Sequence, residues 1–190
     1  MMQNSQPHII GIAGTFAGGK DTLAKYLAEH FHYEHFSTGD MVRVEAQKRY
    51  GSIERPILRK TATELRHDEG AGVFAQRALE HAKNGPLLIS GIRSLGERDA
   101  IVAGGGTIMF IDAPVKARYE RMKARARDDE MLLTLEQFEA NEAKEWYSGD
   151  DPADFNLRDI KRDADIVIEN DADLQTFMGT AVSSLHLTRE

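Results

Sequence analysis

A glycine-rich segment near the start of the chain, residues 14–22, constrains the fold more than any other feature. Its sequence, Gly-Thr-Phe-Ala-Gly-Gly-Lys-Asp-Thr, matches the pattern G-x-x-x-x-G-K. An apolar run at 8–13 precedes it, and from Lys20 onward apolar residues recur at intervals of three and four. Strand, glycine-rich turn, lysine and helix therefore follow in the order that a phosphate-binding loop requires.

The glycines of this loop allow backbone amides to turn toward phosphate oxygens, and the start of the following helix adds a partial positive charge. Lys20 is placed to reach the β and γ phosphates of ATP. We therefore expect one contiguous ATP-binding segment, made of Gly14, Thr15, Phe16, Ala17, Gly18, Gly19, Lys20, Asp21 and Thr22.

Asp21 departs from the usual pattern, which has Ser or Thr after the lysine to bind Mg²⁺. A carboxylate here either helps to hold the metal or repels the nucleotide. Because a bound divalent cation reverses the local charge argument, we favour Asp21 as a ligand of Mg²⁺, directly or through water. Thr22 offers a hydroxyl one position further on. The sequence thus predicts Mg²⁺ beside the ATP phosphates, held by Asp21 and Thr22.

The rest of the chain alternates short apolar runs with stretches of helical periodicity. Further strands are expected at 35–37, 86–90, 107–112 and 164–168. Further helices are expected at 38–50, at 54–84 as two helices divided near 70–72, at 95–103, 115–125 and 134–146, and from 173 onward. This alternation is typical of a parallel sheet with right-handed crossovers. We predict one α/β domain over residues 1–190, with a five-stranded parallel sheet between two layers of helices.

Two of these helix starts carry capping signals. Thr38 or Asp40 can cap the helix that begins near residue 38. Thr134 and Gln137 have the spacing of a capping box, in which each side chain binds the other residue's backbone amide. The spacing predicts that a helix begins directly after Thr134.

Composition excludes several classes of function. Lysine and arginine total 24 against 31 acidic residues, a net charge of −7, so a surface that coats nucleic acid is not expected. Cysteine is absent, which excludes disulfides and thiolate chemistry and fits a cytoplasmic setting. No apolar run approaches the roughly 20 residues that span a bilayer, so no membrane partner is expected. The oligomeric state is left open.

Three arginines come from separate segments that a parallel sheet brings to one edge. Arg43, Arg66 and Arg93 follow different strands or lie on the helices between them. Ligands of such sheets bind at the carboxyl ends of the strands. Because a planar guanidinium holds a phosphate through two hydrogen bonds, the three arginines predict a site for an anionic acceptor.

Two motifs together resemble a known family. The loop at 14–22 and the segment Ser-Thr-Gly-Asp-Met-Val-Arg at 37–43 are similar to those of nucleoside monophosphate kinases, especially adenylate kinases. Over most of its length the chain is also similar to small P-loop proteins identified as dephospho-CoA-kinase-like or as ATPases. That second likeness lies in residues 39–49, 62–66, 91–94, 125–129 and 164–170.

The resemblance implies roles for several residues. Thr38 and Arg43 would contact the acceptor nucleotide, and Asn170, after the last strand, would lie near the adenine base of ATP. The region around 38–84 would bind the acceptor, and the region around 126–150 would form a lid. One departure is Ser90, which stands where these families have an acid that orients Mg²⁺. Asp21, or Asp112 at the end of the next strand, could supply that carboxylate.

Arginines also gather near the expected lid. Arg118, Arg121 and Arg125 share one helix face, and Arg127 follows them. We expect Arg118 to be a solvated surface residue, because surface ion pairs of this kind are common. Arg125 and Arg127 are instead expected to be catalytic, since a closing arginine stabilises the charge on a phosphoryl group in transfer.

Three functions remain open from the sequence. The first is Mg·ATP-dependent phosphoryl transfer to a small phosphate-bearing acceptor, as in a nucleoside monophosphate kinase. The second is a dephospho-CoA kinase, whose hydroxyl acceptor benefits from a carboxylate base, here Asp40. The third is an ATPase or nucleotide-binding regulator without a small acceptor, which Ser90 and Asp21 favour.

Overall fold

Five parallel strands form a single sheet in the order β2-β3-β1-β4-β5. The computed structural model describes residues 7–82, 85–125 and 133–188. The strands are β1 (Ile9–Gly14), β2 (Glu34–Ser37), β3 (Leu87–Ile92), β4 (Thr107–Asp112) and β5 (Ile166–Glu169). The predicted five-stranded parallel sheet is therefore confirmed.

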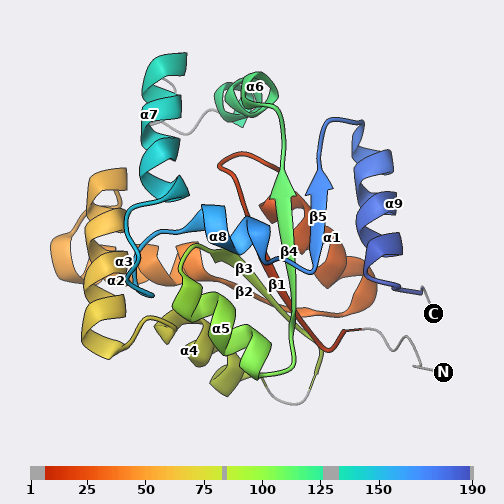
Figure 1. The fold of residues 1–190 in the computed structure, drawn as a ribbon, viewed down its shortest axis with the longest axis horizontal. Coiled ribbons are helices and arrows are strands. Elements are labelled where there is room, and N and C mark those ends of the chain that lie inside the picture. Colours follow the sequence, from red (N-terminus) through yellow and green to blue (C-terminus); the bar gives the residue numbers. More distant parts are fainter. Residues whose placement is uncertain (1–6, 83–84, 126–132, 189–190) are drawn as a thin grey trace.

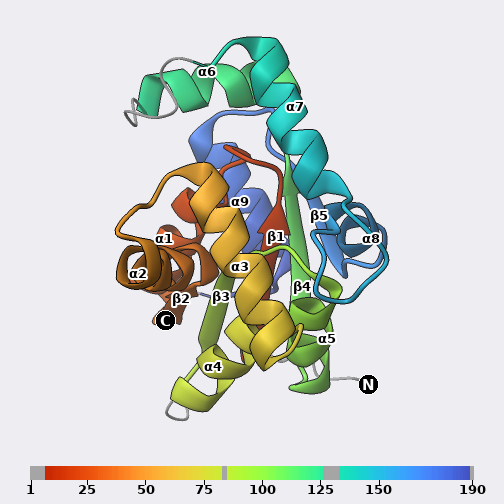
Figure 2. The ribbon, with the colours of Figure 1, turned by 90° about the vertical axis from the view of Figure 1, so that its left-hand side faces the viewer.

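Helices cover both faces of this sheet and extend beyond two of its edges. They are α1 (Lys20–Phe31), α2 (Thr38–Tyr50), α3 (Arg55–Glu69), α4 (Val73–His81), α5 (Leu95–Ala103), α6 (Val115–Arg125), α7 (Leu135–Trp146), α8 (Leu157–Arg162) and α9 (Leu174–Ser184). α1 and α9 pack on one face, and α4, α5 and α8 pack on the other (Figure 1). α6 and α7 lie beyond the carboxyl ends of the strands (Figure 2), and α2 and α3 stand to one side of the sheet (Figure 1).

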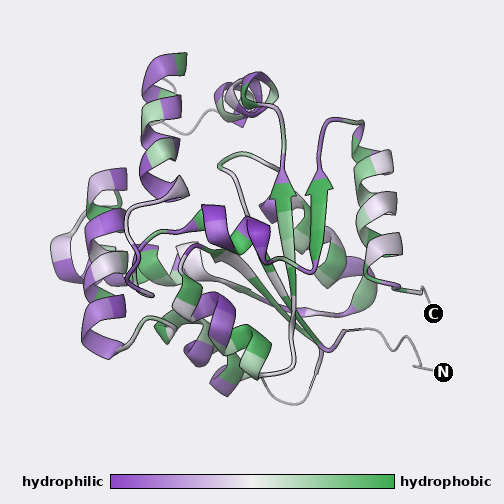
Figure 3. Ribbon diagram, in the orientation of Figure 1, coloured by the Kyte–Doolittle hydropathy of each residue, from purple (hydrophilic) through white to green (hydrophobic). Residues whose placement is uncertain are grey.

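The strands are apolar because both faces of the sheet are covered. On one face Ile10 and Ile12 pack against Leu23 and Leu27 of α1. On the other face β3 and β4 pack against residues of α4, α5 and α8. Figure 3 shows the hydrophobic strands at the centre, with hydrophilic residues concentrated on the surrounding helices. The sheet is thus a rigid platform for the loops at its carboxyl edge.

A third apolar cluster joins the helices beside the sheet. Val42 of α2, Leu65 of α3 and Phe74 of α4 pack together with Phe155, which lies just before α8. The region expected at 38–84 therefore consists of α2, α3 and α4, with its own small core. No helix in the described part of the chain is long and apolar enough to cross a membrane.

The helix starts confirm one capping prediction and correct another. α7 begins with the predicted capping box of Thr134 and Gln137. α2 is capped by Ser37, whose hydroxyl accepts from the amide of Asp40 at 3.2 Å, rather than by Thr38 or Asp40. The cap lies one residue earlier because Thr38 is already helical and its hydroxyl donates to the carbonyl of Gly91 at 2.7 Å.

The short helix α8 is absent from the sequence prediction. It has six residues, too few for a helical period to stand out. Its apolar residues, Leu157 and Ile160, are buried against the sheet, and Asn156 caps it by accepting from the amide of Asp159. Tertiary packing therefore defines this helix more than its own sequence does.

Candidate active site

The phosphate loop, residues 14–22, connects β1 to α1 and has a backbone that needs its glycines. Gly14 has φ 143°, and a Cβ there would lie 2.0 Å from the carbonyl oxygen of Ile111. Gly19 has φ 109°, and a Cβ there would lie 2.4 Å from Nδ2 of Asn170. A side chain at Gly14 would clash with the backbone of β4, and one at Gly19 would displace the side chain of Asn170.

Lys20 begins α1 and turns back into the loop. It is buried, and its Nζ donates to the carbonyl oxygen of Thr15 at 2.6 Å. Burial lowers the pKa of Lys20 to about 8, and the charge of Arg93 acts in the same direction. Asp21 and Glu145 act in the opposite direction. Because desolvation disfavours its charge, this ammonium group gains from any phosphate that approaches it.

Asp112, at the end of β4, holds the phosphate loop in place through a hydrogen bond to Thr15. Its carboxylate accepts from Thr15 Oγ1 at 2.9 Å, from the amide of Ala113 at 2.8 Å and from Lys161 Nζ at 2.6 Å. Burial alone would raise the pKa of Asp112, but these donors outweigh it and keep the pKa below its ordinary value. The sequence offers Asp112 as a carboxylate for Mg²⁺, and the structure shows it engaged with three donors.

Asn170 follows β5 and supports the loop from behind. Its Nδ2 donates to the carbonyl oxygen of Gly18 at 2.8 Å. Its backbone N–H donates to the backbone carbonyl oxygen of Asp112 at 2.7 Å. Arg121 of α6 in turn donates to the carbonyl of Asn170 at 3.0 Å. Asn170 thus lies against the phosphate loop, and its contacts shape the loop itself.

The residues expected to hold Mg²⁺ are accessible. Asp21 and Thr22 are both exposed on the first turn of α1. Ser90, at the position of the missing acid, is buried and shares a 2.8 Å hydrogen bond with Nε2 of His35. Among the described residues, no three His, Cys, Asp or Glu side chains converge on a metal position. The carboxylate of Asp21, near the end of the loop, is therefore open to solvent.

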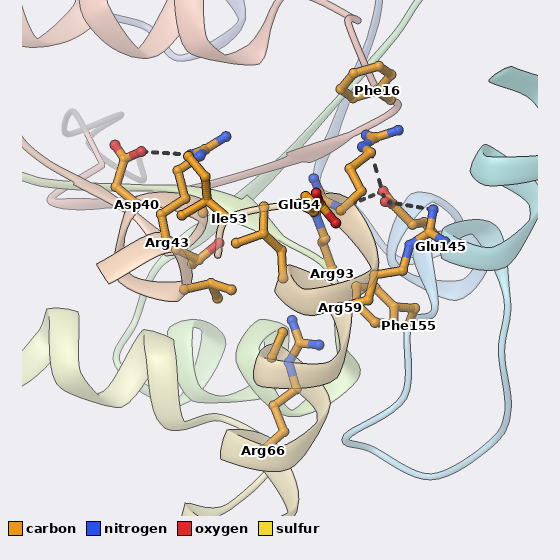
Figure 4. A pocket seen from close by; sticks show the side chains of 16 residues that line it. Phe16, Asp40, Arg43, Ile53, Glu54, Arg59, Arg66, Arg93, Glu145 and Phe155 are labelled. Carbon is orange, nitrogen blue, oxygen red and sulfur yellow. Dashed lines mark hydrogen bonds and ion pairs between the residues drawn. The ribbon is translucent and has the colours of Figure 1, made fainter. Parts of the chain in front are cut away.

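A pocket of about 680 Å³ lies beside the phosphate loop and is rich in arginine; we call it the arginine pocket. Figure 4 shows Phe16 at one end of it, Arg66 at the other, and Glu145 with Arg59 and Arg93 along one wall. Its lining residues are Phe16, Thr38, Gly39, Asp40, Val42, Arg43, Ile53, Glu54, Arg55, Leu58, Arg59, Ala62, Arg66, Arg93, Glu145 and Phe155. The structure therefore brings together Thr38, Arg43, Arg66 and Arg93, the residues that the sequence assigns to the acceptor.

Arg66 is the most buried of these arginines. Its Nε and NH2 atoms each contact Oε1 of Glu97 at 2.9 Å, and both side chains are almost completely buried. Glu97 also accepts from the amide of Arg93 at 2.8 Å. NH1 of Arg66 is buried and has no hydrogen-bond partner among the described residues. The pair thus leaves one terminal nitrogen of a fixed guanidinium without a hydrogen-bond partner in a residue that lines the pocket.

Arg43 and Asp40 form a looser pair at the other side of the pocket. Arg43 NH1 donates to Asp40 Oδ1 at 2.7 Å, and the Asp40 side chain is 73% exposed. Thr38 lines the pocket, but its hydroxyl hydrogen is directed to Gly91. Asp40 therefore reaches the pocket as a solvated, ion-paired carboxylate.

Several pocket residues were not found by sequence reasoning. Arg55 and Arg59 lie one turn apart on α3, and Glu145 lies in the last turn of α7. Glu145 is buried, and its carboxylate contacts Arg93 NH1. Its Oε1 lies 3.7 Å from NH2 of Arg59 and 4.0 Å from NH2 of Arg55. The spacing of the two arginines on one helix face was the available signal, but nothing local indicates that α7 packs against α3.

Arg118 corrects the expectation of a solvated surface residue. It is 6% exposed, and its Nε donates to the carbonyl of Ala113 at 2.6 Å. NH1 contacts Glu142 of α7 and lies 3.4 Å from the carbonyl of Phe16. The α6 helix lies across the end of the sheet, so this face of the helix points inward. Arg118 thereby ties α6 and α7 to the phosphate loop.

Of the two arginines expected to be catalytic, Arg125 and Arg127, the structure describes Arg125. The Arg125 guanidinium lies 5.2 Å from the centre of the Phe16 ring, beside the phosphate loop. The Arg55 guanidinium lies 3.8 Å from the centre of the same ring, so Phe16, a residue of the loop, also lines the arginine pocket. Arg127 and the first part of the expected lid at 126–150 lie outside the described residues.

With this geometry established, comparisons with known proteins identify the family. A family model described as an AAA domain matches residues 10–146. A UPF0200 protein of Pyrobaculum aerophilum is 31% identical over 167 residues, which cover 86% of this chain and 88% of that protein. The chain belongs to the UPF0200 family and contains the AAA domain.

Solved structures show the same fold. A gluconokinase from Sinorhizobium meliloti has a TM-score of 0.57 at 14% identity, covering 95% of this chain and 93% of its own. A deoxyadenosine kinase from M. mycoides with bound dATP has a TM-score of 0.56 at 17% identity, covering 94% and 99%. The domain therefore has a P-loop kinase-like fold, and the predicted α/β class is confirmed.

Proposed function

We propose that the protein transfers the γ-phosphoryl group of Mg·ATP to a small acceptor that carries a phosphate, most specifically a nucleoside monophosphate. The observation that carries the proposal is Arg66. Its guanidinium is fixed by Glu97, lines the arginine pocket, and keeps a buried NH1 without a partner among the described residues. Arg66 stands with Arg43, Arg55, Arg59 and Arg93 in the lining of one pocket, and guanidinium groups gathered in this way favour a phosphate-bearing acceptor.

The neighbouring residues then divide into a donor side and an acceptor side. The loop amides and Lys20 would hold the ATP phosphates, while Arg125 and Arg127 would neutralise charge on the group in transfer. Thr38, Arg43, Arg66 and Arg93 would hold the acceptor. The helices α2, α3 and α4 would form the acceptor-binding region, and α7 would belong to the lid. Such catalysis depends on positioning and electrostatics and needs no covalent nucleophile.

Magnesium fits the residues beside the loop. Mg²⁺ commonly keeps several waters and takes one or two carboxylates together with substrate phosphates. Asp21 offers such a carboxylate, exposed on the first turn of α1, and Thr22 offers a hydroxyl next to it. A bound Mg²⁺ would neutralise part of the phosphate charge.

Two specific observations keep other functions as candidates. Asp40 lines the pocket, so it could act as the base for a hydroxyl acceptor such as dephospho-CoA. Ser90 pairs with His35 where an acid is expected, which would suit an ATPase or a nucleotide-binding regulator without an acceptor. The ion pair of Asp40 with Arg43 disfavours a role for Asp40 as the base, because it engages one of the two carboxylate oxygens.

A product assay tests the proposal. The full chain is incubated with Mg·ATP and each of a panel of nucleoside monophosphates or dephospho-CoA, and ADP and phosphorylated acceptor are both measured. We expect ADP and a nucleoside diphosphate in equal amounts. Phosphorylated dephospho-CoA would support the second candidate, ADP without acceptor product would support an ATPase, and ATP binding without turnover would support a regulator.

A further inference from the structure

One carboxylate in the wall of the arginine pocket is shared by three arginines. Glu145 lies in the last turn of α7 and is 4% exposed. Arg93 follows β3, whereas Arg55 and Arg59 belong to α3. Figure 4 shows Arg59 and Arg93 directed at the carboxylate from different sides. Glu145 thus connects α7 to α3 and to the edge of the sheet.

The carboxylate is charged although it is buried. Burial alone would raise the pKa of Glu145, but the charges of Arg93, Arg55 and Arg59 outweigh it and hold the pKa below its ordinary value. The arginine side chains are more accessible than the carboxylate, at 30%, 19% and 22% exposed respectively. They also line the pocket. Arg93 NH1 contacts the carboxylate, whereas NH2 of Arg59 and NH2 of Arg55 lie 3.7 Å and 4.0 Å from its Oε1. An anionic ligand therefore competes with Glu145 directly at Arg93 and through its charge at Arg55 and Arg59.

The outcome of that competition depends on the charge of the ligand. A ligand carboxylate that takes the place of Glu145 brings the same single charge and the same two oxygens, so it gains no electrostatic advantage. A phosphate monoester carries nearly two charges at neutral pH and three terminal oxygens. Charge-assisted hydrogen bonds to guanidinium groups strengthen accordingly, so the phosphate gains where the carboxylate does not.

We propose that Glu145 is a specificity-determining residue, which contacts Arg93, neutralises part of the charge of Arg55 and Arg59, and thereby favours phosphate monoesters over carboxylates. The inference rests on the proposed function, since it concerns the acceptor of that reaction. A pocket that binds a carboxylate-bearing acceptor would not be expected to hold such a residue, because an internal carboxylate competes with the acceptor's own carboxylate.

A matched pair of ligands tests the proposal. Phenyl phosphate and benzoate share a ring and differ in their anionic group. Their affinities are measured by calorimetry for the wild-type chain, for Glu145→Gln and for the control Glu139→Gln, an exposed residue of the same helix. Mg·ADP is present in excess so that the phosphate loop is occupied. Calorimetry also reports binding without any catalytic turnover.

In the wild type, phenyl phosphate is expected to bind at least about tenfold more tightly than benzoate, because of its extra charge. Glu145→Gln removes the negative charge that faces the three guanidinium groups but keeps the size of the side chain. We expect it to tighten benzoate binding more than phosphate binding, so that the ratio of the two affinities falls by about tenfold. Glu139→Gln should keep the wild-type ratio. An unchanged ratio in Glu145→Gln would overturn the proposal and leave Glu145 as a link between helices.

A measurement on the unaltered protein keeps the test decisive if Glu145→Gln does not fold. Methyl phenyl phosphate has the same ring but only one negative charge, and it should bind at least about tenfold more weakly than phenyl phosphate. Equal binding of the two esters would refute the competition.

Failure of the underlying function has a different signature. If the wild type binds Mg·ATP but neither phenyl phosphate nor any nucleoside monophosphate, the pocket is not a phosphate acceptor site and both proposals fail. If phosphate binds but the selectivity is indifferent to Glu145, the assignment of Glu145 alone fails.

Discussion

The phosphate loop and the arginine pocket lie at the same edge of the sheet but are assembled in different ways. The loop is one contiguous segment, residues 14–22, and its backbone is shaped by glycines and by contacts with the ends of β4 and β5. The pocket draws its charges from α2, α3, α7 and the segment after β3. A phosphate-binding site can thus be encoded locally or by the convergence of distant segments.

The two regions also differ in how their cations are held. Lys20 is buried against a backbone carbonyl, and its pKa is lowered to about 8. In the pocket, Arg43, Arg66 and Arg93 are each paired with an acid. A lysine responds to its surroundings by changing protonation, whereas an arginine keeps its charge and needs a counter-ion when buried. Substitution of Lys20 should therefore reduce activity more than stability, and substitution of a buried arginine should reduce stability.

The largest effect is expected from Arg66→Met, which leaves Glu97 buried without its partner. Removing one member of a buried ion pair costs about 3–5 kcal/mol in the free energy of unfolding. Urea denaturation measures the loss. The matched control is Arg77→Met, which breaks the half-exposed pair of Arg77 with Glu69 and should cost less than about 1 kcal/mol. Similar losses for both variants would mean that Arg66 is no more integral to the pocket than a surface arginine.

Lys20→Met should reduce activity and leave stability intact. The substitution removes a desolvated charge and leaves no buried acid without its partner. We expect phosphoryl transfer to fall by roughly 100- to 1000-fold, as for other preorganised donors to a reacting oxyanion. The free energy of unfolding should not decrease. Lys25→Met, on the exposed face of α1, is the control and should keep full activity. Product formation is measured under saturating Mg·ATP, and a tenfold loss or less would remove Lys20 from the reaction.

The same contrast explains what could be predicted from the sequence. The loop, the five strands and the convergence of Arg43, Arg66 and Arg93 followed from local patterns, since β1, the loop and α1 are contiguous and parallel strands end at one edge. Glu145 could not be found this way, because its role depends on how α7 packs against α3. Arg118 was placed wrongly for the same reason, since its helix has a polar sequence but lies across the phosphate loop.

The protonation of Lys20 should make ATP binding at the phosphate loop depend on pH. With a pKa of about 8, Lys20 in the free protein loses its proton as the pH rises through that value. The affinity for ATP should therefore weaken above pH 8, by at most about tenfold per pH unit. Calorimetric titrations from pH 7 to 9.5 should show this slope in the wild type and not in Lys20→Met. Equal slopes in the two proteins would assign the proton to another group.

The pH dependence of stability has the opposite sign. The pKa of Lys20 is about 8 in the folded chain, below its ordinary value of 10.5, so the unfolded chain binds more protons between these values. The contribution of Lys20 to the free energy of unfolding therefore rises as the pH increases from 8 to 10.5. Urea denaturation across this window should show the rise in the wild type, and its absence in Lys20→Met would complete the assignment.

The smallest effect is expected from Asp40→Asn, at the exposed side of the pocket. A phosphate acceptor is already ionised and needs no base, so the rate of phosphoryl transfer to a nucleoside monophosphate should change by less than about twofold. Its ion pair with Arg43 is solvated, and losing it should cost less than about 1 kcal/mol in the free energy of unfolding. A hydroxyl acceptor would make Asp40 the base, and the loss would then reach about 100-fold. The rates of Asp40→Asn are therefore measured with both acceptor classes. They decide whether the phosphate held in the arginine pocket is itself the group that accepts the phosphoryl group, or whether a hydroxyl elsewhere on the ligand accepts it.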